Sequence, residues 1–191
     1  MTIPDLSLLA ATSWQDYELL DSGAGMKLER FGAYRLIRPE AEAVWQRALP
    51  ENEWRAADAL YKPAPEENGG HWEFRKKMPD QWKMNYTLPN KSQITFRLGL
   101  TAFKHLGIFP EQSANWDYIV NTIGQMKTPK PKVLNLFAYT GGASLAASAA
   151  GAFFMRLLPV PGRPSDLHPC AEFDHAVVRD VEELHGASGI A

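Results

Sequence analysis

Cysteine is almost missing from the 191-residue chain, and neither sign of charge is in large excess. The one cysteine, Cys170, excludes an internal disulfide framework and a zinc site with four cysteine ligands. Lys and Arg number 20 against 22 Asp and Glu, so the net charge of −2 excludes a uniformly basic nucleic-acid-binding protein. With 45% apolar and 22% charged residues, the composition is that of a chain with a core and not of a disordered one.

A basic region followed by an apolar run is also missing at the N-terminus, so no secretory signal is predicted. The stretch from residue 133 to residue 155 has no charge and is long enough to cross a bilayer. Polar residues and the adjacent glycines Gly141 and Gly142 interrupt it, which favours a strand, a turn and a helix. We therefore expect a cytoplasmic protein with no membrane partner and no metal site.

The charge is unevenly distributed along the chain. Residues 1–70 carry a net charge of −5, residues 71–132 carry +6, and residues 133–191 carry −3. The basic middle is also rich in aromatic residues: Trp72, Phe74, Trp82, Tyr86, Phe96, Phe103, Phe109 and Trp116. Basic groups attract phosphates and exposed rings stack on bases, so residues 71–132 are a candidate for RNA binding. The alternative is a β-domain with the rings in its core and the lysines in solvent.

Short segments between glycine and proline turns predict a β-rich first half. The strands are expected at 17–20, 26–31, 34–38, 72–76, 81–86 and 94–100, the first three as a β-meander. Two helical pieces are expected between Pro39 and Leu60, one on each side of Pro50, followed by a loop over 61–70. Another extended piece is expected over 106–109.

The second half has a different pattern. We expect a helix over 111–126, a rigid linker over 128–132 and a buried parallel strand over 132–137. An alanine-rich helix over 143–150 would follow and end at Gly151.

The predicted fold class is α+β. A β-rich N-terminal domain (1–110) would precede a partial α/β Rossmann-like unit (111–152) and a divergent tail (153–191). An amphipathic helix is expected within the tail, over 174–186.

The turn with the adjacent glycines Gly141 and Gly142 carries the strongest functional signal. A glycine-rich turn between a parallel strand and a helix lets a ligand approach the backbone closely, and phosphates, dinucleotides and S-adenosylmethionine use such turns. The spacing matches neither a Walker loop nor the dinucleotide pattern Gly-x-Gly-x-x-Gly. A turn that only joins the strand to the helix is the structural alternative.

Residues 133–146, VLNLFAYTGGASLA, resemble motif I of the class I S-adenosylmethionine-dependent methyltransferases. The resemblance is closest to the large-subunit ribosomal RNA cytosine-5 and guanine-N7 methyltransferases. Residues 104–116, KHLGIFPEQSANW, are similar to the segment that precedes motif I there and covers one side of the cofactor. Residues 19–32 also resemble the leader of a bacterial branch, so the resemblance covers about residues 16–152.

The resemblance implies roles for individual residues. The turn over 137–142 would wrap the amino-acid end of the cofactor, and Asn135 would meet its ammonium group. Thr140 and Ser144 would cap the following helix or bind the carboxylate. The implied cofactor-binding residues are Phe109, Gln112, Asn135, Phe137, Ala138, Tyr139, Thr140, Gly141, Gly142 and Ser144. In the structural alternative, Phe109 and Phe137 are packing residues and Asn135 is an amide at a strand end.

The chain departs from the family after Gly151. No acidic residue closes the next strand, where relatives hold the ribose, and no Asp-Pro-Pro-type substrate motif follows. Cys170 lies two residues from His168, but no family motif matches there, so no catalytic residue is assigned.

These departures lead us to expect a truncated or frame-altered methyltransferase directed at ribosomal RNA through residues 71–132. The alternatives are a non-enzymatic remnant or RNA-binding module, and a small-molecule methyltransferase. The oligomeric state is left open.

Overall fold

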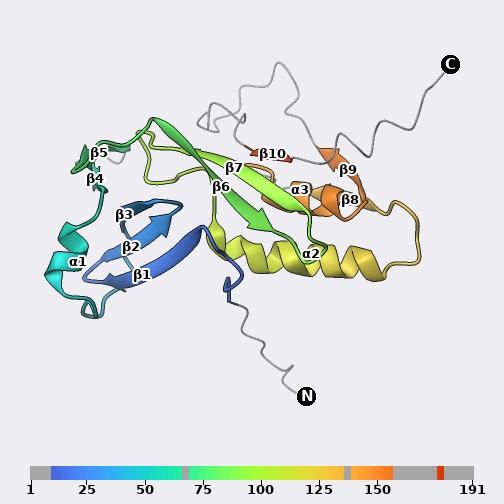
Figure 1. Ribbon diagram of the computed structural model, residues 1–191, viewed down its shortest axis with the longest axis horizontal. Coiled ribbons are helices and arrows are strands. Elements are labelled where there is room, and N and C mark those ends of the chain that lie inside the picture. Colours follow the sequence, from blue (N-terminus) through green and yellow to red (C-terminus); the bar gives the residue numbers. More distant parts are fainter. Residues whose placement is uncertain (1–9, 66–68, 136–138, 157–175, 179–191) are drawn as a thin grey trace.

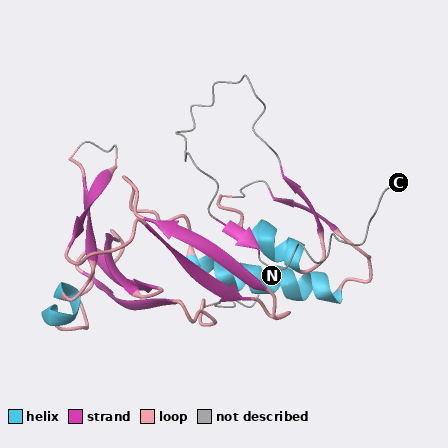
Figure 2. Cartoon of the chain, turned by 45° about the horizontal axis from the view of Figure 1, so that its top comes forward, coloured by secondary structure: helices cyan, strands magenta, loops and turns pink. Residues whose placement is uncertain are grey.

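The computed structural model describes residues 10–65, 69–135, 139–156 and 176–178. Figure 1 shows the N-terminal strands β1 to β5 at one end of the molecule and the elements α3, β8 and β9 at the other. The long β6–β7 hairpin runs between these two ends, and helix α2 lies along it. The second view, in Figure 2, has the same arrangement.

The first sheet has the strand order β1-β2-β3-β4-β5. Its strands are β1 (Tyr17–Gly23), β2 (Met26–Phe31), β3 (Tyr34–Pro39), β4 (Ala59–Pro63) and β5 (Gly70–Phe74). Strands β1 to β3 form an antiparallel meander, as the alternating pattern predicts. Strand β4 pairs in parallel with β3, and β5 pairs antiparallel with β4.

The region between β3 and β4 differs from the sequence prediction. No helix forms between Pro39 and Pro50, and the second predicted helix is the short α1 (Glu51–Arg55). The backbone of the first segment bonds instead to the β1–β2 turn. The N–H of Ala24 donates to the Trp45 carbonyl (2.7 Å), and the N–H of Gly25 donates to the Ala43 carbonyl (2.8 Å). These long-range bonds replace the helical ones, a tertiary effect that local propensity does not contain.

The loop expected over 61–70 is also shorter than predicted. Strand β4 continues to Pro63 and β5 begins at Gly70, because the two strands pair with each other from Ala59 opposite Phe74 to Pro63 opposite Gly70.

Strands β6 (Gln81–Thr87) and β7 (Gln93–Gly99) form an antiparallel hairpin, as predicted. The short strand β10 (Ala176–Val178) pairs with β7, so the helix expected over 174–186 is wrong at these residues. Pairing from Ala176 opposite Phe96 to Val178 opposite Ile94 is a long-range contact, which the local helical pattern does not contain. Residues 106–109 join no ladder in the described part of the chain.

The last described region holds η1 (Pro110–Gln112), α2 (Ser113–Gln125), β8 (Lys132–Asn135), α3 (Gly142–Ala149) and β9 (Phe153–Arg156). Both predicted helices are confirmed, and Gly151 ends the second one with a left-handed φ of 86°. Strands β8 and β9 are parallel. The expected burial of β8 is wrong, since Leu134 is 52% exposed. Within the described residues β9 is its one strand neighbour, which leaves this side chain uncovered.

The main core lies between the hairpin and the helices. The ring of Trp116 on α2 packs against Trp14 (6.0 Å between centroids), Tyr86 (5.5 Å) and Phe96 (5.3 Å). Ala146 of α3 belongs to the same cluster. A separate small cluster holds Leu28, Ile37, Trp54 and Ala57. The core therefore joins residues from both sides of position 110, and the domain limits given above remain a prediction.

No helix among the described residues is long and apolar enough to cross a membrane. Within the same residues, no group of three or more His, Cys, Asp or Glu side chains is placed to hold a metal ion.

Candidate functional site

Residues 104–110, called segment 104–110 below, form an extended stretch without a strand partner. Its side chains still alternate, because Leu106 and Ile108 are each 2% exposed and Pro110 is buried. His105, Gly107 and Phe109, which alternate with these core positions, are less buried, although Gly107 interrupts the extended backbone with a left-handed φ of 87°. One face of the segment thus belongs to the main core, and the other is available to line a site.

The outer face of segment 104–110 meets the turn between β8 and α3. The rings of Phe109 and Tyr139 are 4.7 Å apart, tilted by 38°. At Gly107, a Cβ atom would lie 3.7 Å from the Thr140 side chain, which is ordinary contact distance. Two stretches about thirty residues apart in sequence are therefore side by side.

The turn itself depends on left-handed backbone. Gly141, the N-cap residue of α3, has a φ of 93°, and Tyr139 has a φ of 46°. The N-cap Gly141 has no side chain to cap α3, and among the described residues no hydrogen bond is found from the first N–H groups of α3 to Thr140 or Ser144. The first N–H groups of a helix have no intrahelical acceptor, and they favour an anionic group such as a carboxylate.

Gly142 lets α3 approach α2 closely. A Cβ atom on this residue would lie 2.6 Å and 2.9 Å from two carbons of the Trp116 indole. Trp116 is itself 4% exposed, so the ring has little room to move. The second glycine of the pair is therefore needed for packing, whereas the first is needed for backbone conformation.

Asn135 and Ser144 connect the strand to the helix. The amide nitrogen Nδ2 of Asn135 donates to Oγ of Ser144 at 3.1 Å, and Ser144 is 7% exposed. Asn135 is the last residue of β8, and the carboxyl ends of parallel strands are where open α/β sheets bind their ligands. The strand end, the glycine turn and segment 104–110 together form the candidate site.

The remaining predicted residues are less closely tied to this arrangement. Gln112 is exposed in η1, where its side-chain oxygen accepts a hydrogen bond from Asn115 at 2.9 Å. Phe137 and Ala138 lie outside the described residues. Their predicted contacts with the cofactor, like that of Gln112, stay predictions.

Sequence reasoning did not assign a role at the site to His105, or to Trp116 as the partner of Gly142. The His105 ring stands edge-on to Phe109 with centroids 5.5 Å apart. Burial lowers the pKa of His105, and the nearby charges of Arg38, Lys104 and Lys27 lower it further. The only sequence signal for either residue was its place within the stretch 104–116.

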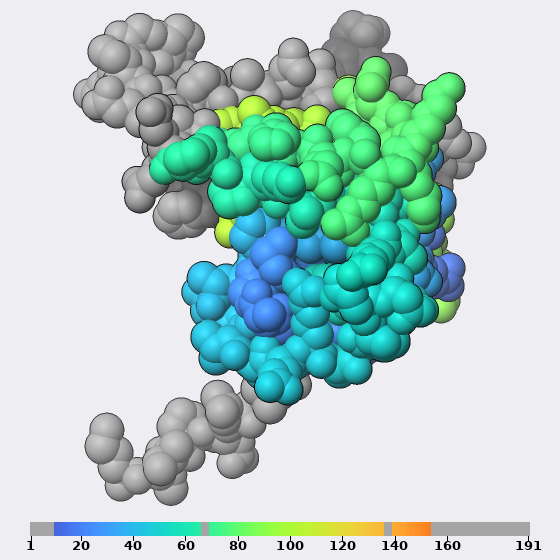
Figure 3. Space-filling view, turned by 90° about the vertical axis from the view of Figure 1, so that its left-hand side faces the viewer, coloured from blue at the N-terminus to red at the C-terminus, as the bar shows by residue number. Residues whose placement is uncertain are grey.

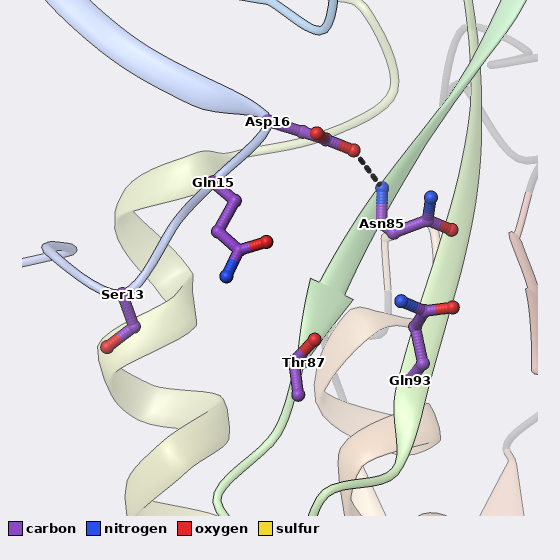
Figure 4. A pocket seen from close by; sticks show the side chains of 6 residues that line it. All are labelled: Ser13, Gln15, Asp16, Asn85, Thr87 and Gln93. Atoms are coloured by element: carbon purple, nitrogen blue, oxygen red, sulfur yellow. Dashed lines mark hydrogen bonds between the residues drawn. The ribbon is translucent and has the colours of Figure 1, made fainter.

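A polar hollow lies elsewhere, between the start of β1 and the β6–β7 hairpin (Figure 4). It has a volume of about 380 Å³, open solvent included, and its lining is Ser13, Gln15, Asp16, Asn85, Thr87 and Gln93. The Asp16 carboxylate accepts the backbone N–H of Asn85 at 2.8 Å and so ties the β1 entry to β6. The hollow shares no residue with the candidate site.

Among solved structures, the chain is similar to the SAM-dependent methyltransferase from Agrobacterium tumefaciens. The two are 40% identical with a TM-score of 0.67, over 75% of this chain and 44% of that one. Two further structures share the fold. One is assigned as a SAM-dependent methyltransferase from Streptococcus mutans (18% identity, TM-score 0.50, 76% of this chain and 39% of that one). The other is SMU.776, assigned as a methyltransferase and complexed with SAH (16%, 0.50, 80% and 46%).

The chain spans less than half the length of each of these three proteins. No protein-family model matches it, and no curated protein matches it. The similarity supports the resemblance to SAM-dependent methyltransferases and the mixed α/β character of the fold. The closer resemblance to ribosomal RNA enzymes and the expected truncation remain predictions, as does the partial form of the Rossmann-like unit.

Proposed function

We propose that the chain is an RNA-directed protein of the S-adenosylmethionine-dependent methyltransferase type, which binds the cofactor at the turn between β8 and α3 and RNA through residues 71–132, without methyl transfer by the 191-residue chain itself. The observation that carries the proposal is the contact between Phe109 and Tyr139, which brings segment 104–110 against that turn. The 40% identity to a SAM-dependent methyltransferase supports the same assignment.

The residues at the site suit the chemical groups of this cofactor. The first N–H groups of α3 fit its carboxylate. An ammonium needs an acceptor, and the side-chain amide oxygen of Asn135 is a group of that kind at the strand end. Aromatic faces such as those of Phe109 and Tyr139 attract cations and cover apolar surface. When bound, the cofactor supplies an electrophilic methyl group, and these residues hold its amino-acid end and one side of it.

Thermal unfolding with and without SAH tests the cofactor assignment. A ligand that binds only the folded state raises the unfolding temperature in proportion to the logarithm of its concentration. We expect SAH to do so and homocysteine alone not to. Asn135→Leu should reduce the shift, while Asn121→Leu, the same substitution at an exposed position on α2, should leave it unchanged. Equal shifts in both variants would contradict the role of Asn135.

The RNA part of the proposal depends on the basic region 71–132. Some basic side chains of this region are already bound to other groups of the protein. Lys76 pairs with Asp58 at 2.9 Å and also donates to the Ala56 carbonyl. Arg75 donates to the Trp54 carbonyl at 3.1 Å. Both therefore stabilise the α1–β4 connection, so loss of RNA binding on their replacement would be hard to separate from loss of structure.

Other groups of this region are better placed for RNA. Lys77, Lys83 and Lys91 are exposed and take part in none of the ion pairs found among the described residues. Phe74 is 57% exposed and Phe103 50%, so both rings can stack on bases. Figure 3 shows the face formed by the first half of the chain, on which residues of about 70–85 gather at the upper right.

Salt-dependent binding to a ribosomal RNA fragment tests this assignment. Lys77→Glu should weaken binding and lower the slope of log affinity against log salt by roughly one phosphate contact. Arg55→Glu is the matched control, because Arg55 is 77% exposed and lies outside the basic region. Equal affinity of both variants and the unaltered chain would count against an RNA role for this region. If SAH binding were retained in that case, a small-molecule acceptor would be favoured.

A further inference from the structure

Segment 104–110 forms the near side of the candidate site, yet none of the strands in the described part of the chain pairs with it. Apolar packing of Leu106 and Ile108 fixes only its inner face. An extended stretch of this kind leaves its backbone carbonyls without ladder partners, and these need other donors when they are shielded from water.

Two side chains from the N-terminal part supply donors at the two ends of the segment. At the first end, Nη1 of Arg38 donates to the carbonyl of Lys104 at 3.0 Å. At the other end, the indole Nε1 of Trp14 donates to the carbonyl of Pro110 at 2.9 Å. The partners are 66 and 96 residues apart in sequence, so both bonds are tertiary contacts.

Each donor is itself held rigidly. Arg38 makes a paired hydrogen bond to Glu29, at 2.7 and 2.8 Å, and both side chains are buried. Tyr17 donates to the same carboxylate at 3.0 Å, and burial, with the nearby charge of Glu29, raises the pKa of Tyr17, so its hydroxyl stays a donor. Trp14 is 8% exposed and packs against the Tyr86 ring at 4.6 Å. Buried paired groups of this kind set geometry more than they add stability.

We infer that Arg38 and Trp14 are positioning residues for the cofactor site, which fix segment 104–110 from both ends so that Phe109 faces Tyr139. This inference rests on the proposed function. The hydrogen bonds found for these two donors among the described residues reach segment 104–110 and Glu29 and not residues 139–141 of the β8–α3 turn, so we assign their effect on the site to the segment. If one anchor is lost, only a fraction of molecules keeps the segment in its binding position, and the apparent affinity falls by that fraction.

Trp14→Phe tests the inference, because it keeps an aromatic ring in the core and removes the donor to Pro110 together with part of the indole. Trp54→Phe is a matched control. It removes an indole donor to Asp21 (3.0 Å) in the separate small cluster, which does not contact segment 104–110. Each variant leaves one acceptor short of a bond, and the bond to the Asp21 carboxylate is the stronger of the two, so Trp54→Phe should lose at least as much stability as Trp14→Phe. Arg38→Lys is a second variant that keeps a charge beside Glu29 but cannot reach both Glu29 and Lys104.

Two measurements are made on each variant: SAH affinity by calorimetry, and amide hydrogen exchange of residues 105–109 without ligand. We expect faster exchange there in Trp14→Phe and Arg38→Lys, and about tenfold weaker SAH binding. Trp54→Phe should stay within about twofold of the unaltered chain, as distant sites act independently.

Unchanged exchange at 105–109 in Trp14→Phe would overturn the inference, and so would equal loss of SAH affinity in Trp14→Phe and Trp54→Phe. If the unaltered chain bound no SAH, the proposed function would fail, and so would the claim that Trp14 and Arg38 influence the affinity for SAH. The exchange data would then still decide whether the two anchors hold the segment.

Discussion

Replacing Gly142 by alanine tests the packing on which the site is built. The added Cβ would lie 2.6 Å from a carbon of the Trp116 indole, about 1 Å closer than a relaxed carbon contact. The indole cannot turn aside easily, because Phe96 stacks on it at 5.3 Å and Tyr86 packs edge-on at 5.5 Å. Either α3 or Trp116 must therefore shift.

The expected cost of Gly142→Ala is that of overpacking a core, about 1–3 kcal/mol in the free energy of unfolding. For a chain of this size that corresponds to a fall of roughly 2–10 °C in the unfolding temperature. Gly124→Ala on α2 is the control, since a Cβ there meets nothing within 4 Å. The control should stabilise the protein by about 0.5–1 kcal/mol, the ordinary gain from alanine in a helix.

Denaturant unfolding followed by circular dichroism measures both variants. The double variant Gly142→Ala/Trp116→Phe adds a direct check, because the smaller ring makes room for the methyl group. Gly142→Ala should then cost much less than it does beside Trp116, and the two substitutions should be non-additive. A Gly142→Ala protein as stable as the Gly124→Ala control would refute the close approach of α3 to Trp116.

Three further predictions follow from single residues. Burial acts to raise the pKa of Asp21, but hydrogen bonds from Leu49, Trp54, Ala48 and Ser22 outweigh it and leave the pKa below its ordinary value. Asp21 therefore stabilises the fold above about pH 4, and this contribution is lost as the pH falls through the lowered pKa. When unfolding is measured at several pH values, the free energy of unfolding should fall less steeply towards acid pH in Asp21→Asn than in the unaltered chain. The same dependence on pH in both proteins would contradict this role of Asp21. Gly151→Ala should lower the free energy of unfolding by about 1–2 kcal/mol, because the left-handed φ of 86° is unfavourable for alanine. Crowding would not contribute, since a Cβ there meets nothing within 4 Å, and an unchanged unfolding temperature would contradict backbone strain as the cause. A tritiated-methyl assay on ribosomal RNA should show no transfer, since the strand after α3 ends at Arg156 without the ribose-binding carboxylate expected by resemblance; turnover abolished by Gly141→Arg would contradict this.

The sequence predicted the parts of the fold in which local pattern and tertiary packing agree. The alternation over 26–31 and 34–38 produced the observed β2 and β3, and the helix over 111–126 matches α2. At the site, the resemblance pointed to residues 104–116 and to the turn over 137–142 separately, and the contact between Phe109 and Tyr139 is visible only in three dimensions.

The remaining features depend on long-range contacts that no local pattern contains. Residues 40–49 could form a helix by composition, but the β1–β2 turn offers their backbone better partners at Ala24 and Gly25. The apolar run at β8 predicts a buried strand, yet burial depends on which neighbours cover Leu134. Likewise, Arg38 and Trp14 carry no motif, and their contacts with Lys104 and Pro110 are visible only in three dimensions.

Calorimetric titration of the 191-residue chain with SAH at millimolar concentration tests the central claim most directly. Circular dichroism of the same sample would establish that the protein is folded, and Gly141→Arg, which places a large side chain in the turn, provides the comparison. We predict weak, saturable heat for the unaltered chain and none for Gly141→Arg. A folded, unaltered chain that gives no heat would contradict cofactor binding at the β8–α3 turn.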